Sequence, residues 1–95
     1  MKKIINYKKY DTETATKISE WRRGRRFDKV HECLYRKKTG EYFLYGEGGA
    51  KSKYRKSIGT NWWSGSERII PMTTEEAKTW GSEYMDEEAY EKEFQ

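Results

Sequence analysis

Apolar positions along the chain change their spacing several times, and each change predicts a new element. Residues 3–10 mix apolar side chains with lysines, which is typical of a short strand, or of a strand that turns at Asn6-Tyr7-Lys8. We expect Ile4, Ile5 and Tyr10 to be its buried part.

Residues 12–23 have a helical spacing, because Ala15, Ile18 and Trp21 or Arg22 follow one another at intervals of three or four. The Asp11-Thr12-Glu13 start carries side-chain oxygens that can accept from open backbone N–H groups and an acid that suits the helix dipole. Gly24 is the expected C-terminal stop. The pattern therefore predicts an N-terminal helix over residues 12–23.

Two β-rich runs, residues 30–37 and 42–45, surround Thr39-Gly40, which predicts a hairpin because glycine accepts the positive φ of a tight turn. The following Gly46-Glu47-Gly48-Gly49 predicts a sharp turn that leaves this hairpin. It is weak evidence for a phosphate-binding loop, since no Gly-Lys-Ser/Thr follows it. Residues 51–56 predict a basic loop or one short helical turn.

Residues 58–95 predict an ordered loop or edge segment, a strand and two helices. The loop is residues 58–66, and the strand is residues 68–70, ended by Pro71 because proline lacks a backbone donor. Thr73 or Thr74 begins a helix that runs through Trp80 and Tyr84. The apolar stripe then drifts, which predicts a break near Asp86 and a last short helix capped by that residue.

The fold class that follows is α+β: a small antiparallel β-sheet of three or four strands packed with an N-terminal helix and one or two C-terminal helices. Ninety-five residues predict a single domain, 1–95, because a chain of this length cannot bury two cores. Four Trp and eight Tyr exclude the disordered class, since each buried aromatic ring removes much apolar surface from water.

Cysteine usage and hydropathy bear on the compartment. Cys33 is the only cysteine, which excludes an intramolecular disulfide and fits a reducing compartment. The chain has neither a signal-peptide pattern nor an apolar run of about 20 residues, the length of a membrane span. We therefore expect a cytoplasmic protein with no membrane partner.

Charge is sorted by position. Residues 1–56 carry 17 Lys and Arg against 7 Asp and Glu, whereas residues 57–95 carry 3 against 9. The net charge of +4 therefore hides a dipole, with one surface suited to phosphate and another suited to sites that bind phosphate. Because the boundary falls within the predicted sheet, it divides faces of one domain.

Two basic segments stand beside aromatic residues, a combination that proteins use to bind single-stranded nucleic acid and RNA. The alternative is a solvated loop surface with the tryptophans in the core. The candidate binding residues are Arg22, Arg23, Arg25, Arg26, Lys51, Lys53, Tyr54, Arg55, Lys56, Trp62 and Trp63.

Glu83, Glu87 and Glu91 recur every four residues, which on one helix places carboxylates about 6 Å apart, close to the spacing of phosphates along a strand. Such a row could imitate nucleic acid and occupy a basic channel. The alternative is the polar face of an amphipathic helix. The break expected near Asp86 weakens the row.

No catalytic site, metal site or cofactor is predicted. His31 is the only histidine, with neither a second His nor a Cys pair nearby, so it does not predict a metal site. Cys33 and His31 would project from one face of a strand, but the sequence shows no third group to orient the pair.

Blocks spread over most of the chain carry a family resemblance. They are MKKIIN at 1–6, KYDTETA at 9–15, LYRKKTGEYFLYGEGG at 34–49, IIPMT at 69–73 and EEA at 75–77, of which 34–49 is the most specific. They resemble small proteins carried by phages and conjugative elements of Gram-positive bacteria. Several anti-CRISPR proteins against type II systems contain a similar segment, alone or joined to other domains.

The resemblance implies an anti-CRISPR inhibitor that binds the type II RNA-guided Cas effector nuclease or its guide RNA. It would block guide loading, target DNA binding or cleavage without an enzymatic activity. A rival hypothesis is a nucleic-acid-binding accessory or regulatory protein of a mobile element, and a third is a protein–protein adaptor. Open sheet edges would also allow a homodimer.

This chain departs from the pattern of the group at two places. Tyr7 stands where glycine is common, and the run from Arg22 to Arg26 is unusually basic. These departures could mark the target of this member of the group.

Overall fold

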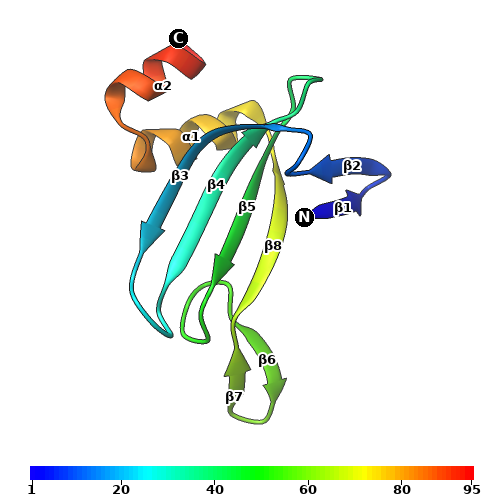
Figure 1. Cartoon of the computed structure of the whole chain (residues 1–95), viewed down its shortest axis with the longest axis vertical. Helices are drawn as coiled ribbons and strands as arrows, with labels where there is room; N and C mark the ends of the chain where they lie inside the picture. The colour runs from blue at the N-terminus through cyan, green and yellow to red at the C-terminus, as the bar shows by residue number, and fades with distance from the viewer.

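The computed structural model describes residues 1–95 and has a four-stranded antiparallel sheet at its centre (Figure 1). Its strands lie in the order β3 (Thr16–Arg23), β4 (Val30–Arg36), β5 (Tyr42–Gly48) and β8 (Ser66–Met72). Two separate hairpins are β1 (Lys2–Ile5) with β2 (Lys8–Asp11), and β6 (Lys56–Gly59) with β7 (Trp62–Ser64). Two helices, α1 (Thr74–Tyr84) and α2 (Glu87–Phe94), end the chain. The α+β class with an antiparallel sheet and C-terminal helices is confirmed.

The predicted N-terminal helix is wrong, because residues 16–23 form the edge strand β3. The pairing of β3 with β4 shifts between Lys17 and Ser19, so Ile18 is an extra residue in a β-bulge. Ile18 and Trp21 consequently pack against the same core cluster although they are three residues apart. A bulged strand thus produced the spacing that was interpreted as a helix.

Gly24 does not end a helix; it begins the connection from β3 to β4. Its φ is +80°, and a Cβ at this position would lie 2.9 Å from the carbonyl oxygen of Asp28. Glycine is therefore required by the turn and by the close approach of the returning backbone.

The β1–β2 hairpin confirms the predicted turn at residues 6–8. Asn6 and Tyr7 have φ values of 50° and 68°, which is the pattern of a two-residue turn that prefers Asn-Gly. Tyr10 is buried against Phe43 and Ile69 in a core cluster on one face of the sheet, and Ile5 packs at its edge. The expectation that Ile4 is buried is wrong, since its side chain faces solvent.

The hairpin of β4 and β5 is confirmed, with Gly40 at φ +93° in its turn. The sharp turn predicted at residues 46–49 is wrong for Gly46 and Gly48, which lie within β5. A Cβ on Gly46 would lie 2.0 Å from the Tyr54 ring, and one on Gly48 would lie 2.2 Å from Ser52 Oγ. These glycines leave room for the segment after β5 to pack on the sheet.

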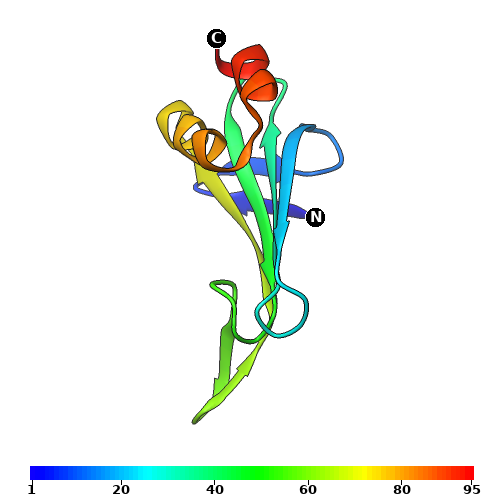
Figure 2. The ribbon, with the colours of Figure 1, turned by 90° about the vertical axis from the view of Figure 1, so that its left-hand side faces the viewer.

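Residues 58–66, predicted as an ordered loop or edge segment, contain most of the β6–β7 hairpin, which extends beyond the sheet (Figures 1 and 2). Pro71 does not end β8, which continues to Met72. An edge strand tolerates proline because half of its backbone groups face away from the sheet.

The two C-terminal helices begin where the sequence predicts. Thr73 caps α1 in a reciprocal pair with Glu76, and the side chain of Asp86 accepts from the backbone N–H of Ala89 to cap α2. Ala77 and Trp80 pack on Leu34, Tyr42 and Leu44 on the sheet face opposite the Tyr10 cluster. Neither helix has the length and apolar character to cross a membrane.

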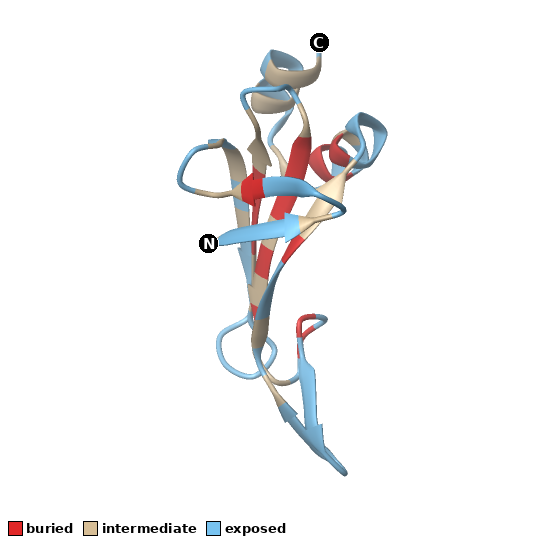
Figure 3. Ribbon diagram, turned by 90° about the vertical axis from the view of Figure 1, so that its right-hand side faces the viewer, coloured by how far each residue is buried: buried red, intermediate tan, exposed pale blue.

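Burial is concentrated at one end of the sheet. Figure 3 shows buried residues along β5 and α1, whereas the β6–β7 hairpin is almost entirely exposed. The core therefore supports one end of the molecule, and the other end projects into solvent.

Replacing Tyr7 by glycine should stabilise the protein by about 1 kcal/mol and raise Tm by about 4–8 °C, because a side chain at positive φ is strained. The Tyr7 side chain is fully exposed, so its loss removes no packing. Thermal and urea unfolding measure the effect.

Gly40→Ala is the matched control, since Gly40 also has positive φ and a Cβ there would meet nothing within 4 Å. It should lower the free energy of unfolding by about 1 kcal/mol for the same backbone reason. A destabilised Tyr7→Gly variant would contradict the assignment of this turn.

Candidate functional site

Three segments meet at the end of the sheet opposite the helices (Figure 1). They are residues 22–29, 49–56 and 62–65, and we call this region the cationic tip. The backbone N–H of Lys51 donates to the carbonyl oxygen of Phe27 at 2.6 Å, and that of Gly49 donates to the carbonyl oxygen of Lys29 at 3.0 Å. A Cβ on Gly65 would lie 2.4 Å from the carbonyl oxygen of Gly48, so the third segment packs equally closely.

The cationic tip carries a strong, largely uncompensated positive charge. Residues 22–29 and 51–56 contain nine Lys and Arg and one acidic residue. Lys53 pairs with Glu32 at 2.7 Å, and Arg22 lies 3.7 Å from a carboxylate oxygen of Glu20. The cations without a carboxylate within 4 Å are Arg23, Arg25, Arg26, Lys29, Lys51, Arg55 and Lys56.

Aromatic rings stand among these cations. Trp62 is 70 % exposed, Phe27 62 % and Trp63 47 %, so the interpretation that places these tryptophans in the core is wrong. The Arg55 guanidinium lies 4.6 Å from the centre of a Trp63 ring. A hollow of about 690 Å³ between Phe27 and Trp63 is also lined by Arg25 and Arg26. Cations and accessible ring faces therefore share one surface.

Tyr54, a predicted contact residue, is instead buried, with 1 % of its surface exposed. Its hydroxyl donates to a carboxylate oxygen of Glu32, and its ring packs over Gly46. Burial and the neighbouring Glu32 carboxylate both raise the pKa of Tyr54, so the phenol remains protonated. Tyr54 positions the basic segment and does not present a ring to a ligand.

The buried carboxylate of Glu32 anchors the basic segment, residues 51–56, to the sheet and to α1. It has no exposed surface, and its two oxygens accept from Trp80 Nε1 at 3.0 Å, from Lys53 Nζ at 2.7 Å and from the Tyr54 hydroxyl. Burial alone would raise the pKa of Glu32, but these three donors outweigh it and hold the pKa below its usual value. The carboxylate thus joins β4, α1 and the segment after β5.

Arg68 completes the attachment of the basic segment. Its guanidinium donates to the carbonyl oxygen of Lys53 at 3.0 Å and lies 5.1 Å from the centre of the Tyr54 ring. Ser66 donates to the carbonyl oxygen of Tyr54. Neither Glu32 nor Arg68 was predicted from the sequence. The one available signal was that Glu32 is an acidic residue within a mostly apolar strand pattern.

The three glutamates of the predicted acidic row are exposed but do not share one helix. Glu83 belongs to α1, whereas Glu87 and Glu91 belong to α2, and the chain is extended at Met85 and Asp86 between them. Residues 73–95 nevertheless carry eight acidic and two basic side chains. This acidic end lies opposite the cationic tip along the 45 Å axis of the molecule (Figure 1).

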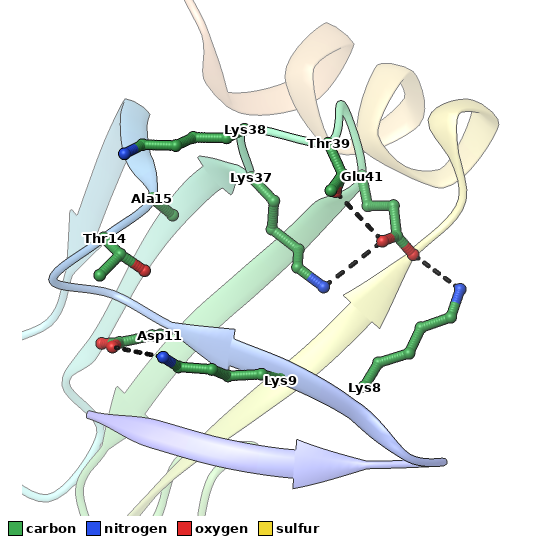
Figure 4. Close-up of a pocket in the computed structure, with 9 residues that line it drawn as sticks. All are labelled: Lys8, Lys9, Asp11, Thr14, Ala15, Lys37, Lys38, Thr39 and Glu41. Carbon is green, nitrogen blue, oxygen red and sulfur yellow. Dashed lines mark hydrogen bonds and ion pairs between the residues drawn. The ribbon is translucent and has the colours of Figure 1, made fainter.

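A second group of lysines surrounds a hollow of about 360 Å³ beside β2 (Figure 4). Lys8 and Lys37 reach Glu41 at 2.8 and 3.4 Å, and Lys9 lies 4.0 Å from Asp11. Carboxylates therefore offset much of its charge, and we interpret it as a packing feature. The sequence analysis missed it because its lysines come from segments that only the fold brings together.

His31 has neighbours that the sequence analysis did not identify. Its Nδ1 lies 3.1 Å from Glu47 Oε1, its Nε2 lies 2.8 Å from Glu20 Oε2, and Cys33 Sγ lies 3.3 Å from the same Nε2. The expectation that no third group orients His31 is wrong. Burial nevertheless raises the pKa of the Cys33 thiol to about 11, which makes it a poor nucleophile.

Comparison with known proteins adds no assignment. No protein-family model, curated protein or solved structure matches this chain. The charge, exposure and geometry of the cationic tip therefore carry the functional assignment.

Glu32→Gln should lower the free energy of unfolding by about 2–4 kcal/mol, because the amide cannot accept from all three donors and the Lys53 ammonium loses its partner. Chemical unfolding near neutral pH measures this loss. Glu83→Gln, on the exposed face of α1, is the control and should change stability by less than about 0.5 kcal/mol.

Comparison of the wild type with Glu32→Gln at several pH values tests whether the pKa of Glu32 is lowered in the folded protein. Because the folded-state pKa of Glu32 is below its ordinary value of 4.5, the stability that the carboxylate contributes is present above that pH and is lost as pH falls through the folded-state pKa. The stability difference between the wild type and Glu32→Gln should therefore shrink in acid. A stability difference that grows as pH falls would contradict the assignment of Glu32 as an ionised carboxylate that accepts from three donors.

Proposed function

We propose that this protein is a non-enzymatic inhibitor of the RNA-guided effector nuclease of a type II CRISPR system. It would bind the guide RNA, or the effector where it holds that RNA, and block guide loading, target DNA binding or cleavage. The observation that carries the proposal is the cationic tip, where Arg and Lys side chains line a hollow with exposed Phe27 and Trp63, and where Trp62, beside Trp63, is also exposed.

The chemistry of the cationic tip favours RNA or another single strand as the surface that it contacts. Guanidinium and ammonium groups hold phosphates, while exposed indole faces stack on unpaired bases. A regular duplex offers its phosphates but keeps its bases stacked, so it would use the cations and leave the tryptophans without partners. Guide RNA has loops and unpaired ends that satisfy both.

The family resemblance supports the same proposal. The residues that carry it lie mainly in the sheet, whereas the residues that depart from it most lie in the cationic tip. The block 34–49, the most specific part of the resemblance, contains the last three residues of β4, the hairpin turn and all of β5, and so belongs to the two central strands of the sheet. The unusually basic run from Arg22 to Arg26 lies in the cationic tip. A common scaffold with a variable tip is what inhibitors of different effectors require.

Replacing Arg22, Arg23, Arg25 and Arg26 together by Glu should abolish inhibition in a DNA-cleavage assay with a purified type II effector and its guide RNA. All four side chains are exposed, so the fold should remain. The matched control replaces Lys2, Lys3, Lys9 and Lys38, which are also exposed, and changes the net charge equally. Full potency of the arginine variant would reject the cationic tip as the contact surface.

The exposed tryptophans also favour a second function, a nucleic-acid-binding accessory or regulatory protein of a mobile element. This function requires direct binding to RNA or DNA without the effector, with an affinity that falls steeply with salt. A gel shift with and without the effector distinguishes the two. If the four arginines contact phosphates, the variant that replaces them should show a smaller dependence of log affinity for a single strand on log salt concentration. The slope should fall in magnitude by about 3.

Trp62→Ala should weaken binding to guide RNA by about 1–3 kcal/mol through the loss of stacking. Since Trp62 is 70 % exposed, the free energy of unfolding should stay nearly constant. Tyr7→Gly, which removes an exposed ring far from the cationic tip, is the control for nonspecific aromatic contact. Equal losses in both variants would contradict a stacking role for Trp62.

A further inference from the structure

A cluster of metal-ligand side chains lies across three neighbouring strands. Glu20 on β3 is the register partner of Cys33 on β4, and His31 on β4 is the register partner of Glu47 on β5. Glu32, between His31 and Cys33, faces Trp80 of α1, so its two neighbours project from the opposite face. Strand pairing therefore holds these four side chains together.

Three donor atoms of different chemistry converge in this cluster. Glu20 Oε2, His31 Nε2 and Cys33 Sγ all lie within 4.8 Å of one another. The individual separations are 2.8 Å from oxygen to nitrogen, 3.3 Å from nitrogen to sulfur and 3.8 Å from sulfur to oxygen. Tetrahedral zinc bonds of about 2.0–2.3 Å place such ligand pairs about 3.3–3.7 Å apart. Each separation is thus within about 0.6 Å of the value that one central ion requires.

We propose that Glu20, His31 and Cys33 form a binding site for a single Zn²⁺ ion. A carboxylate, an imidazole and a thiolate together suit a borderline-soft ion, whereas calcium and magnesium prefer oxygen alone. Three protein ligands leave one tetrahedral position for water. Zinc binding would release two protons to solvent, the Cys33 thiol proton and the proton between His31 Nε2 and Glu20 Oε2, and would replace the contacts among the three donors by bonds to the ion.

Glu47 has the position of an outer carboxylate that orients a metal-binding histidine. Its Oε1 lies 3.1 Å from His31 Nδ1, which leaves Nε2 directed at Glu20 and Cys33. Its other oxygen accepts from the Tyr45 hydroxyl at 2.9 Å. Carboxylate–histidine pairs of this kind fix the ring orientation and increase the basicity of the ligating nitrogen. Glu47 is therefore a positioning residue and does not ligate the ion.

The side chains around the three ligands have opposite effects on zinc binding. Cys33 is 3 % exposed and the His31 side chain 19 %, so two of the ligands are already held in place. Lys17 Nζ and Arg22 Nη2 lie 3.6 and 3.7 Å from Glu20 Oε2 and compete with a cation for that oxygen. We therefore expect weaker binding than in a structural site with four cysteines or histidines, and tighter binding in a Lys17→Gln variant.

Cobalt titration of the untagged protein, residues 1–95, tests the site directly. Cys33 is the only thiol and His31 the only imidazole of the chain, so a thiolate-to-cobalt charge-transfer band in the near ultraviolet can arise only there. We expect this band, visible absorption typical of tetrahedral cobalt, saturation at one ion per chain and displacement by Zn²⁺. Titration to high cobalt concentration without a charge-transfer band would overturn the proposal.

Variants assign the ligands. Cys33→Ser should abolish the band, while His31→Ala and Glu20→Gln should each weaken Zn²⁺ binding at least about tenfold. Glu47→Ala should weaken it about 10- to 100-fold while keeping the band, as expected for a positioning residue. Glu83→Gln is the control for nonspecific carboxylate binding and should leave affinity unchanged.

Each variant is first compared with the wild type by circular dichroism and urea unfolding without metal. Where a ligand variant proves to be unfolded, Lys17→Gln gives an independent result. It leaves all three ligands in place and should tighten zinc binding. Unchanged zinc affinity in folded His31→Ala, or weaker binding in Lys17→Gln, would contradict the site.

Discussion

A buried carboxylate determines how the two ends of this molecule are related. Glu32 has no exposed surface, yet it stays ionised because an indole, a phenol and an ammonium group donate to it. The donors come from α1 and from the segment after β5, which are far apart in the sequence. An unpaired carboxylate at this position would be strongly destabilising, so the basic segment must pack where Tyr54 and Lys53 can reach it. The glycines of β5 make this approach sterically feasible.

This constraint explains how a small protein presents a large charged surface without losing its fold. The apolar core lies beside the helices, and the cationic tip extends from the far end of the sheet, where few side chains are buried (Figures 2 and 3). Repulsion among the nine cations of residues 22–29 and 51–56 would favour an expanded loop. The Glu32 network, the Arg68 contact with Lys53 and the hydrogen bond from Lys51 to Phe27 oppose that expansion.

Local signals in the sequence were sufficient for elements that depend on local chemistry. The turn at Thr39-Gly40 and the helix caps follow from residues a few positions apart: the turn and the cap at Asp86 were predicted, and Thr73 was one of two predicted starts of α1. The helix expected over residues 12–23 failed because a bulge in β3 puts Ile18 and Trp21 on one face, a feature that depends on pairing with β4. The exposed cations of the cationic tip could be predicted from composition. The partners of Glu32 and His31 could not, because they depend on strand register and on packing between distant segments.

Amide hydrogen exchange at the cationic tip tests the central claim, that the buried carboxylate holds the basic segment as an ordered surface. The backbone N–H groups of Gly49 and Lys51 donate to the 22–29 segment, and that of Tyr54 donates to Ser52 Oγ. The account predicts that these three amides exchange as slowly as those of β3 in the wild type, and much faster in the folded Glu32→Gln variant. Fast exchange at all three positions in the wild type, with protected strands beside them, would contradict it.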